Sequence, residues 1–459
     1  MNSKDTIVAV GTRPGEAAIG IVKLSGRNSI NIADKIFRAK NSSKIKELET
    51  YSMVYGHIVD KGSIIDEVVV SLMKNPKSYT KEDVVEINCH GGMIPVGKVM
   101  ELCVEKGARI AEPGEFTKRA FLSGRIDLSQ AESVIDIVRS RTEESLKIAA
   151  KNLQGNVKNN IEKLRNRILD VMAQLEASVD FVEEDLEITP YNKLEMDVIK
   201  IKEELVEIID DEKRGEIIKN GVKVAIVGKP NVGKSSLLNY LLGNDKAIVT
   251  SIPGTTRDAV EEVIYVEGIP LILVDTAGIR KTKNAIEKIG VGKSIEHIDE
   301  AELIIMVMDG NGKLEKTDME IIKKIKNKTS ICCVNKIDLE LKIDIGKIKN
   351  FFKYGNIIKI SALKGTGIKR LEDIIRKTAL NGGDINLEEK VIVNKRQMNI
   401  LKKVKSTLDK AERAMAERMS EEFPSYDLKE AYTMLGEIIG KTVRDDILEK
   451  IFGQFCVGK

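Results

Sequence analysis

The sequence has little cysteine and no surplus of charge. Its five cysteines are odd in number, sparse for 459 residues and free of any C-x-x-C spacing. This usage argues against a disulfide framework and against a structural zinc site, and it favours a reducing cytoplasm. Lys plus Arg number 74 and Asp plus Glu 71, a net charge of +3. No blanket of positive charge therefore indicates nucleic-acid binding, and a polyanion would need a local basic patch.

Long hydrophobic runs are absent as well. The longest apolar stretches, such as Leu303–Met308, have the length of a strand and are too short to span a bilayer. The first ten residues have neither the apolar run of a signal peptide nor the bias of a transit peptide. We therefore expect a cytoplasmic protein without a membrane segment. At about 150 residues per domain, the length predicts roughly three domains.

Residues 1–118 are expected to form a compact α/β domain. Short β-rich runs alternate there with turn clusters, and Met93–Glu105 has a helical period. The expected strands are Thr6–Val10, Ile19–Leu24, Tyr51–Val59, Ile64–Met73 and Val84–Cys89.

Two helical regions flank a second α/β region. From Arg141 to Val179 apolar residues recur every three or four positions, which predicts one long helix interrupted at most by Gly155. We expect a helical domain in two parts, 119–220 and 381–459, with an α/β domain inserted at 221–380. Three separate domains in a row are the alternative, although amphipathic helices on both flanks need an apolar partner.

The inserted region is predicted to be a doubly wound parallel sheet. Its buried-type strands alternate with helical segments, as is typical of that fold. The expected strands are Val222–Val227, Leu271–Val274, Leu303–Met308, Ile331–Val334 and Ile357–Ile360.

A phosphate-binding loop follows the first of these strands. Residues 228–235 read G-K-P-N-V-G-K-S and precede a helical segment, so both the pattern and its context match a P-loop. Such a loop wraps phosphates with backbone N–H groups. Lys234 is expected to reach the β- and γ-phosphates, and the Ser235 hydroxyl to bind Mg²⁺.

Guanine is the base that the later motifs select. Asp338 of N-K-I-D can accept both the ring N–H and the exocyclic amine of guanine, which adenine does not offer. Asp275-Thr276-Ala277-Gly278 and Gly254-Thr255-Thr256 fit the two switch segments, and Ser361-Ala362-Leu363 would lie behind the base. The sequence therefore predicts a P-loop GTPase.

Ile279 stands where Ras-like enzymes carry the glutamine that orients the attacking water. An arginine finger, typically worth about 10³–10⁵ in rate, would have to supply charge instead, or a monovalent cation held against the phosphates would serve the same electrostatic end. Arg257, Arg280 and Glu287 lie in or near the switch segments and are candidates, although a solvated surface side chain is the usual outcome for one such residue.

Motifs outside the G region carry a more specific resemblance. They are S-Y-T-K-E-D-V-V-E at 78–86, C-H-G-G at 89–92, P-G-E-F-T-K-R-A-F-L at 113–122, G-T-T-R-D at 254–258 and F-C-V-G-K at 455–459. Together they make the chain similar to the MnmE (TrmE) family of tRNA-modification GTPases over essentially its whole length.

The resemblance implies a reaction and partners. Family members modify C5 of the wobble uridine of certain tRNAs with an aminomethyl-type group, together with an FAD-containing MnmG-type subunit in a heterotetramer. The one-carbon unit comes from a reduced folate, 5,10-methylene- or 5-formyl-tetrahydrofolate. Family members are homodimers that bind folate in the N-terminal domain, and their G domains pair in a potassium-dependent way to hydrolyse GTP.

The resemblance also implies site residues. Mg²⁺ would be held by Ser235 and Thr256, potassium by Asn231, Thr250, Ile252 and Thr255, and the water would be positioned by Glu287. The residues expected around GTP are Asn231, Val232, Gly233, Lys234, Ser235, Ser236, Thr250, Ser251, Ile252, Pro253, Gly254, Thr255, Thr256, Asp275, Thr276, Ala277, Gly278, Asn335, Lys336, Asp338, Ser361, Ala362 and Leu363.

Folate positions carry over to Lys23, Glu86, Arg125 and Lys459. A glutamate can pair with the amino and ring N–H edge of a pterin, and basic groups suit the folate glutamate tail. Arg125 stands where lysine is frequent in the family, which changes a point charge into a planar fork. Cys456 in the terminal Cys-Val-Gly-Lys tail is a candidate catalytic thiol, or an idle thiol on a frayed end.

Two other functions remain open on the sequence. One is a GTP-switched RNA-binding protein of ribosome assembly, although the chain has one G domain and no recognisable KH loop after it. The other is a standalone GTPase with a regulatory helical arm, whose turnover would be indifferent to potassium.

Overall fold

The computed structural model describes residues 5–180, 190–243, 262–274, 298–352, 356–380 and 390–459. The chain divides into two compact units. One comprises Met1–Val138, Lys151–Ile201 and Lys403–Lys459, and the other comprises Arg139–Ala150 and Lys202–Lys402. Each unit combines segments that are far apart in the sequence.

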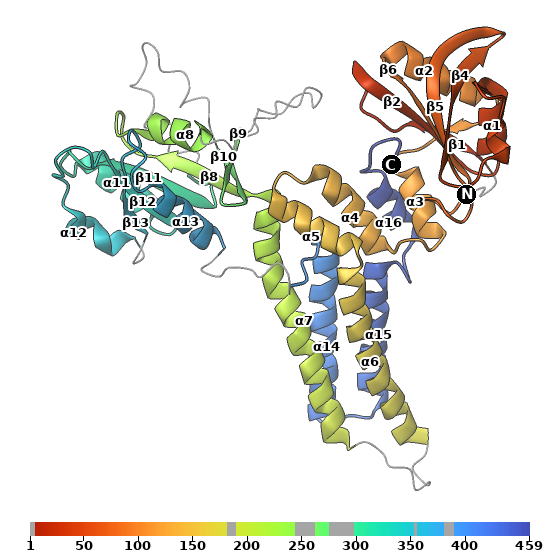
Figure 1. The fold of residues 1–459 in the computed structure, drawn as a ribbon. Helices are drawn as coiled ribbons and strands as arrows, with labels where there is room; N and C mark the ends of the chain where they lie inside the picture. The colour runs from red at the N-terminus through yellow and green to blue at the C-terminus, as the bar shows by residue number, and fades with distance from the viewer. Residues whose placement is uncertain (1–4, 181–189, 244–261, 275–297, 353–355, 381–389) are drawn as a thin grey trace. The chain divides into compact units, whose positions relative to one another are not determined.

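A seven-stranded sheet forms the N-terminal part of the first unit. Figure 1 draws this sheet with its strands β1, β2, β4, β5 and β6 labelled. Its strand order is β3-β4-β5-β6-β2-β1-β7, and every neighbouring pair is antiparallel except β1 and β7. The strands are β1 Ile7–Val10, β2 Ala17–Ser25, β3 Phe37–Ala39, β4 Ser52–Asp60, β5 Ser63–Met73, β6 Val84–Gly91 and β7 Arg109–Ile110.

Helices α1 (Ser29–Ile36) and α2 (Met93–Glu105) contact each other and pack on this sheet. Strand residues such as Val22, Leu24 and Ile87 are fully buried beneath them, together with Leu102 of α2. Alternate strand residues point to the other face of the sheet. Lys23 and Glu86 are a register pair on that face, because Lys23 of β2 lies opposite Glu86 of β6.

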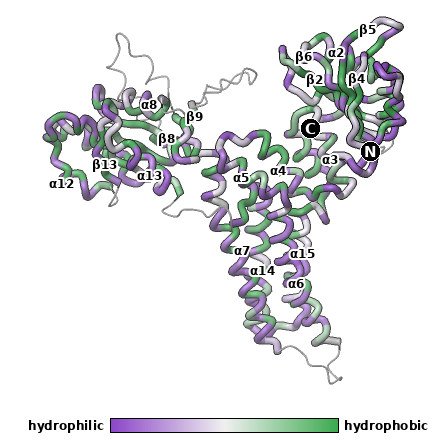
Figure 2. The backbone as a smooth tube through the Cα atoms, in the orientation of Figure 1, coloured by the Kyte–Doolittle hydropathy of each residue, from purple (hydrophilic) through white to green (hydrophobic). Residues whose placement is uncertain are grey.

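Further helices lie between and after the segments that form the two sheets. A 3₁₀ turn, η1, spans Ile45–Glu47. The helices are α3 Glu115–Leu122, α4 Leu128–Arg139, α5 Glu143–Leu153, α6 Asn156–Asp180, α7 Tyr191–Asn220, α14 Lys395–Ala416, α15 Glu422–Ile439 and α16 Asp445–Phe452. Within the first unit α6 and α15 lie side by side (Figure 1). Hydrophobic and hydrophilic residues alternate along both helices (Figure 2), as amphipathic packing requires.

The second unit contains a six-stranded sheet in the order β13-β12-β11-β8-β10-β9. All neighbouring pairs are parallel except β9 and β10. The elements are β8 Val222–Val227, α8 Lys234–Gly243, β9 Glu262–Val266, β10 Ile269–Leu273, β11 Leu303–Asp309, α11 Lys316–Ile325, β12 Ser330–Asn335, α12 Ile345–Ile348, η3 Lys349–Phe351, β13 Ile357–Lys359 and α13 Ile368–Ala379.

Two apolar clusters cover the two faces of this sheet. Val224 and Ile226 join a cluster with α8 and α13, whereas Ala225 and Val227 join one with α11. Helices on both faces of a mainly parallel sheet are the doubly wound arrangement. Ile148 of α5 belongs to the first cluster, so the start of α5 packs into the core of this unit.

The predicted fold class is confirmed: an α/β N-terminal part, a helical part and an inserted doubly wound sheet. The helix expected from 141 to 179 is two helices, α5 and α6, because Gly155 between them has a left-handed φ of 96°. The antiparallel edge strand β9 and helix α4 were not predicted. The domain boundaries at 118, 220 and 380 stay predictions. No helix among the described residues is long and apolar enough to cross a membrane.

Candidate functional sites

The phosphate loop lies where the sequence places it, between β8 and α8. Gly228, Asn231 and Gly233 all have positive φ, of 151°, 62° and 100°. A Cβ on Gly228 would come within 2.2 Å of the Val307 carbonyl oxygen, so only glycine fits against β11. Lys234 is the first residue of α8, and its Nζ donates to the carbonyls of Gly228 at 2.8 Å and Lys229 at 2.7 Å. The ammonium therefore lies over the loop that would wrap the phosphates.

The base-recognition motif is joined directly to this loop through Asn335. Asn335 is 3% exposed; its Nδ2 donates to the Val232 carbonyl at 2.8 Å and its Oδ1 accepts from the Ala362 N–H at 2.9 Å. One side chain thus fixes the P-loop, the end of β12 and the segment after β13 in one geometry. Sequence reasoning grouped these residues around GTP but did not predict that Asn335 itself ties the segments together.

The Asp338 carboxyl is oriented by a neighbouring hydroxyl group. Its Oδ1 accepts a 2.6 Å hydrogen bond from the Ser361 hydroxyl, and this bond lowers the pKa of Asp338 below its usual value. The carboxyl is therefore ionised at neutral pH and can accept two donors from guanine. Lys336 pairs with Asp309 at 2.6 Å, while Leu363 is 82% exposed beside Ser361.

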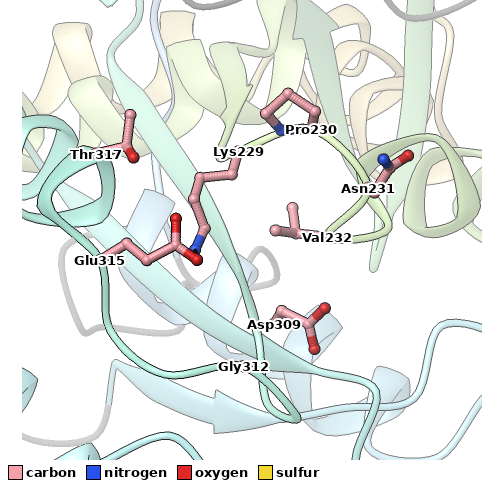
Figure 3. Close-up of a pocket in the computed structure, with 8 residues that line it drawn as sticks. All are labelled: Lys229, Pro230, Asn231, Val232, Asp309, Gly312, Glu315 and Thr317. Atoms are coloured by element: carbon pink, nitrogen blue, oxygen red, sulfur yellow. Dashed lines mark ion pairs between the residues drawn. The ribbon is translucent and has the colours of Figure 1, made fainter.

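A pocket of this region is lined by loop and β11–α11 residues (Figure 3). The lining residues are Lys229, Pro230, Asn231, Val232, Asp309, Gly312, Glu315 and Thr317. Ser235 and Ser236 are exposed in the first turn of α8. The predicted switch residues lie outside the described residues: Thr250, Ser251, Ile252, Pro253, Gly254, Thr255, Thr256, Asp275, Thr276, Ala277, Gly278 and Glu287.

A second candidate site lies on the N-terminal sheet, around Lys23. Its Nζ is 3.5 Å from Glu86 Oε1, and lies 5.1 Å and 5.2 Å from the ring centroids of Tyr79 and Phe116. The Arg125 guanidinium lies 4.7 Å from the Tyr79 ring. Two basic side chains therefore share one aromatic ring next to a single carboxylate.

The electrostatics of this site reflect crowded positive charge. Burial lowers the pKa of Lys23; Glu86 opposes that shift, and the charges of Lys459 and Arg125 add to it. We call Lys23, Arg125 and Lys459 the N-terminal cation cluster. The three basic side chains around Glu86 make the site positively charged, so it fits an anionic ligand.

The C-terminal tail is docked beside this cluster. The Phe116 N–H donates to the Lys459 carbonyl at 3.2 Å, and the Gly114 N–H donates to the Cys456 carbonyl at 3.4 Å. Gly458 has φ 96°, and a Cβ there would lie 2.4 Å from the Val10 carbonyl oxygen. The tail is therefore packed against the N-terminal part of the chain, and the alternative of a frayed end is wrong. The Cys456 thiol is exposed, and its catalytic role stays a prediction.

Sequence reasoning missed the residues that support the cluster. Tyr79 donates or accepts a 3.1 Å hydrogen bond with the Thr117 hydroxyl, and burial raises the Tyr79 pKa. Arg119 ties α3 to other segments by ion pairs of 2.7 Å to Asp5 and 3.1 Å to Glu82, and it pairs within the helix with Glu115 at 2.9 Å. These residues belong to, or pair with, the quoted motifs at 78–86 and 113–122, which were the available signal.

The P-loop, the Asn335 connection and the Asp338 acceptor together define a P-loop GTPase. Comparison with known proteins refines this class. The family model of the MnmE helical domain matches residues 128–456, and the model of the GTP-binding protein TrmE N-terminus matches residues 6–125.

Curated relatives match over the full length. The tRNA modification GTPase MnmE of Clostridioides difficile is 46% identical over 99% of both chains, and that of Thermoanaerobacter pseudethanolicus is also 46% identical over 99% of both chains. The chain therefore belongs to the MnmE family of tRNA modification GTPases. A crystal structure of Era with MgGDPNP and a 16S ribosomal RNA segment is 30% identical, covering 40% of this chain and 66% of that chain with a TM-score of 0.27.

Proposed function

We propose that this GTPase acts with tRNA and an FAD-containing MnmG-type subunit to modify C5 of the wobble uridine. A reduced folate, 5,10-methylene- or 5-formyl-tetrahydrofolate, supplies the one-carbon unit of the aminomethyl or carboxymethylaminomethyl group. The observation that carries the proposal is the meeting of Lys23, Glu86, Arg125 and Lys459 beside two aromatic rings in a chain of this family.

In the folate site the carboxylate and the basic side chains have different tasks. Glu86 accepts from the amino and ring N–H edge of the pterin, and the N-terminal cation cluster binds the carboxylates of the glutamate tail. Cys456, on the tail that ends in Lys459, is the proposed reactive thiol. The free cysteines of the described residues agree with a reducing cytoplasm, which is the location that we propose.

Calorimetric titration with 5-formyl-tetrahydrofolate tests this site. Lys23→Met removes one charge-assisted contact and should weaken binding by about tenfold or more. Lys98→Met is the matched control, because the Lys98 ammonium pairs with Glu101 at 3.1 Å and Asp60 at 3.9 Å and has no part in the site. No saturable folate binding by the unaltered protein would refute the folate part of the proposal.

The G domain that we propose spans residues 221–380, between helical segments 119–220 and 381–459. In this domain Ser235 and Thr256 hold Mg²⁺. Asn231, Thr250, Ile252 and Thr255 hold potassium, and Glu287 positions the water. Potassium beside the phosphates supplies positive charge at a site where Ile279 can orient nothing.

GTP turnover measured in KCl and in NaCl of equal ionic strength tests the cation. We expect much faster turnover in KCl, accompanied by pairing of the G domains of the proposed homodimer. Equal rates would favour a standalone GTPase with a helical arm. Near-normal hydrolysis by Glu287→Ala would remove the role of that residue.

The whole assignment is tested by mass spectrometry of wobble uridines in tRNA from cells with and without the protein. Unchanged nucleosides would refute tRNA modification and favour a GTP-switched protein of ribosome assembly.

A further inference from the structure

The side chain of Lys229, the second residue of the phosphate loop, is directed toward the N-terminal end of α11. It is 13% exposed, and its Nζ lies 2.9 Å from Asp318 Oδ2 and 3.1 Å from Glu315 Oε1. Figure 3 shows Lys229 reaching toward Glu315 across the pocket. A lysine in a surface loop ordinarily keeps its ammonium in water. In Lys229 the ammonium gives up part of its hydration and is held instead by the two carboxylates.

The acidic end of this contact is rigid. Glu315 is the N-cap of α11 and Asp318 is the third residue of that helix, and together they form a capping box. Asp318 is 3% exposed, its Oδ2 accepts the Glu315 N–H at 3.0 Å, and its Oδ1 is buried without a hydrogen bond. The ammonium of Lys229 thus provides the counter-charge of a buried carboxylate on a fixed helix end.

The other end of the contact is the loop backbone. The Lys229 carbonyl accepts from Lys234 Nζ at 2.7 Å, and Asn231, two residues on, has its left-handed φ. The following residue, Val232, is tied by its carbonyl to Asn335. The short segment 229–232 is therefore anchored at both ends, with Asn231 between the anchors.

We propose that Lys229 is a positioning residue: its ion pair with the α11 capping box presets segment 229–232 for phosphates and for the cation at Asn231. Lys229 makes this contribution without touching the nucleotide. The part that concerns potassium rests on the proposed function of Asn231; the part that concerns phosphates does not.

A double variant separates positioning from folding. Lys229→Met alone leaves the Asp318 carboxylate buried without a counter-charge and can fail to fold. Lys229→Met combined with Asp318→Asn removes both charges and keeps the amide oxygen that accepts the Glu315 N–H. Lys369→Met is the matched control, because the Lys369 side chain is 70% exposed and pairs on the surface with Glu267 and Glu372.

The readouts are the full chain's melting temperature, its affinity for a fluorescent GDP analogue and the potassium concentration that gives half-maximal turnover. We expect the double variant to melt close to the unaltered protein. It should bind GDP at least about fivefold more weakly and need at least about fivefold more potassium, with kcat at saturating potassium little changed. In GDP affinity and potassium requirement, Lys229→Arg should lie between the double variant and the unaltered protein. Lys369→Met should change neither quantity.

The outcomes distinguish this inference from the proposed function. A double variant with normal stability, GDP affinity and potassium requirement would overturn the inference and leave Lys229 a structural ion pair. If the unaltered protein turns over equally in KCl and NaCl, the proposed potassium site fails. The GDP affinity of the double variant then decides alone: weakening supports the positioning role, and no change refutes it.

Discussion

The buried side chain of Asn335 makes the sharpest stability prediction. Asn335→Ala removes both of its hydrogen bonds and leaves the Val232 carbonyl and the Ala362 N–H buried without partners. Each orphaned buried group costs about 1–3 kcal/mol, so the two together should destabilise the G domain by about 2–6 kcal/mol. Asn335 Nδ2 also fills the space beside Gly233, where a Cβ would lie only 2.2 Å away.

Hydrogen exchange of the full chain measures this cost locally, which suits a multidomain protein whose global unfolding is not one transition. Amides of β11 and β12 should lose protection by about 30-fold or more, since 1.4 kcal/mol is a factor of ten. Affinity for a GDP analogue should fall in parallel, because the P-loop loses its attachment at Val232.

Asn356→Ala is the matched control. Its Nδ2 donates one part-buried hydrogen bond, of 3.0 Å, to the Ser330 carbonyl at the other end of β12. That loss should cost about 0.5–1.5 kcal/mol and leave GDP affinity unchanged. If Asn335→Ala lost no more protection than Asn356→Ala and bound GDP normally, the reasoning on Asn335 would be refuted.

Three further predictions concern the first unit. The hydrogen bond to Asp66 raises the pKa of His90 above 6.5. This pair therefore stabilises the fold at low pH, and its contribution is lost as the pH rises through the raised pKa. NMR titration of His90 should show a midpoint above 6.5, and Asp66→Asn should remove this upward shift. Burial raises the pKa of Glu115, but hydrogen bonds, first that from Arg109, lower it overall. The stability that Glu115 contributes is therefore present above its usual pKa and is lost on acidification. At pH 7 Glu115→Ala should lower the local unfolding free energy of α3, measured by hydrogen exchange, by about 3–5 kcal/mol, an expectation that a loss below about 1 kcal/mol would contradict. Cys456 is exposed and the other four cysteines are buried, so a thiol reagent should modify a single cysteine rapidly in the folded chain, and rapid modification of Cys456→Ser would show this wrong.

Much of the fold could be predicted because its signals are local. Strand β8 spans Val222–Val227 and helix α2 spans Met93–Glu105, both as the periodicity predicts. The break at Gly155 was recognised only as a possibility, because a glycine inside an apolar period can be tolerated in a helix or can end it. Strand β9 is short and lies at the sheet edge, where pairing with β10 rather than its own pattern decides its direction.

The sequence by itself determined the P-loop, the N-K-I-D motif that ends in Asp338, and the full-length similarity to the MnmE family. The tertiary structure alone decided which of these groups touch. Asn335 reaches Val232 across 103 positions, and Lys23 meets Glu86 only because β2 and β6 pair in that register. Short motifs and periods act over a few residues, whereas such contacts depend on strand register and packing, which a linear pattern does not encode.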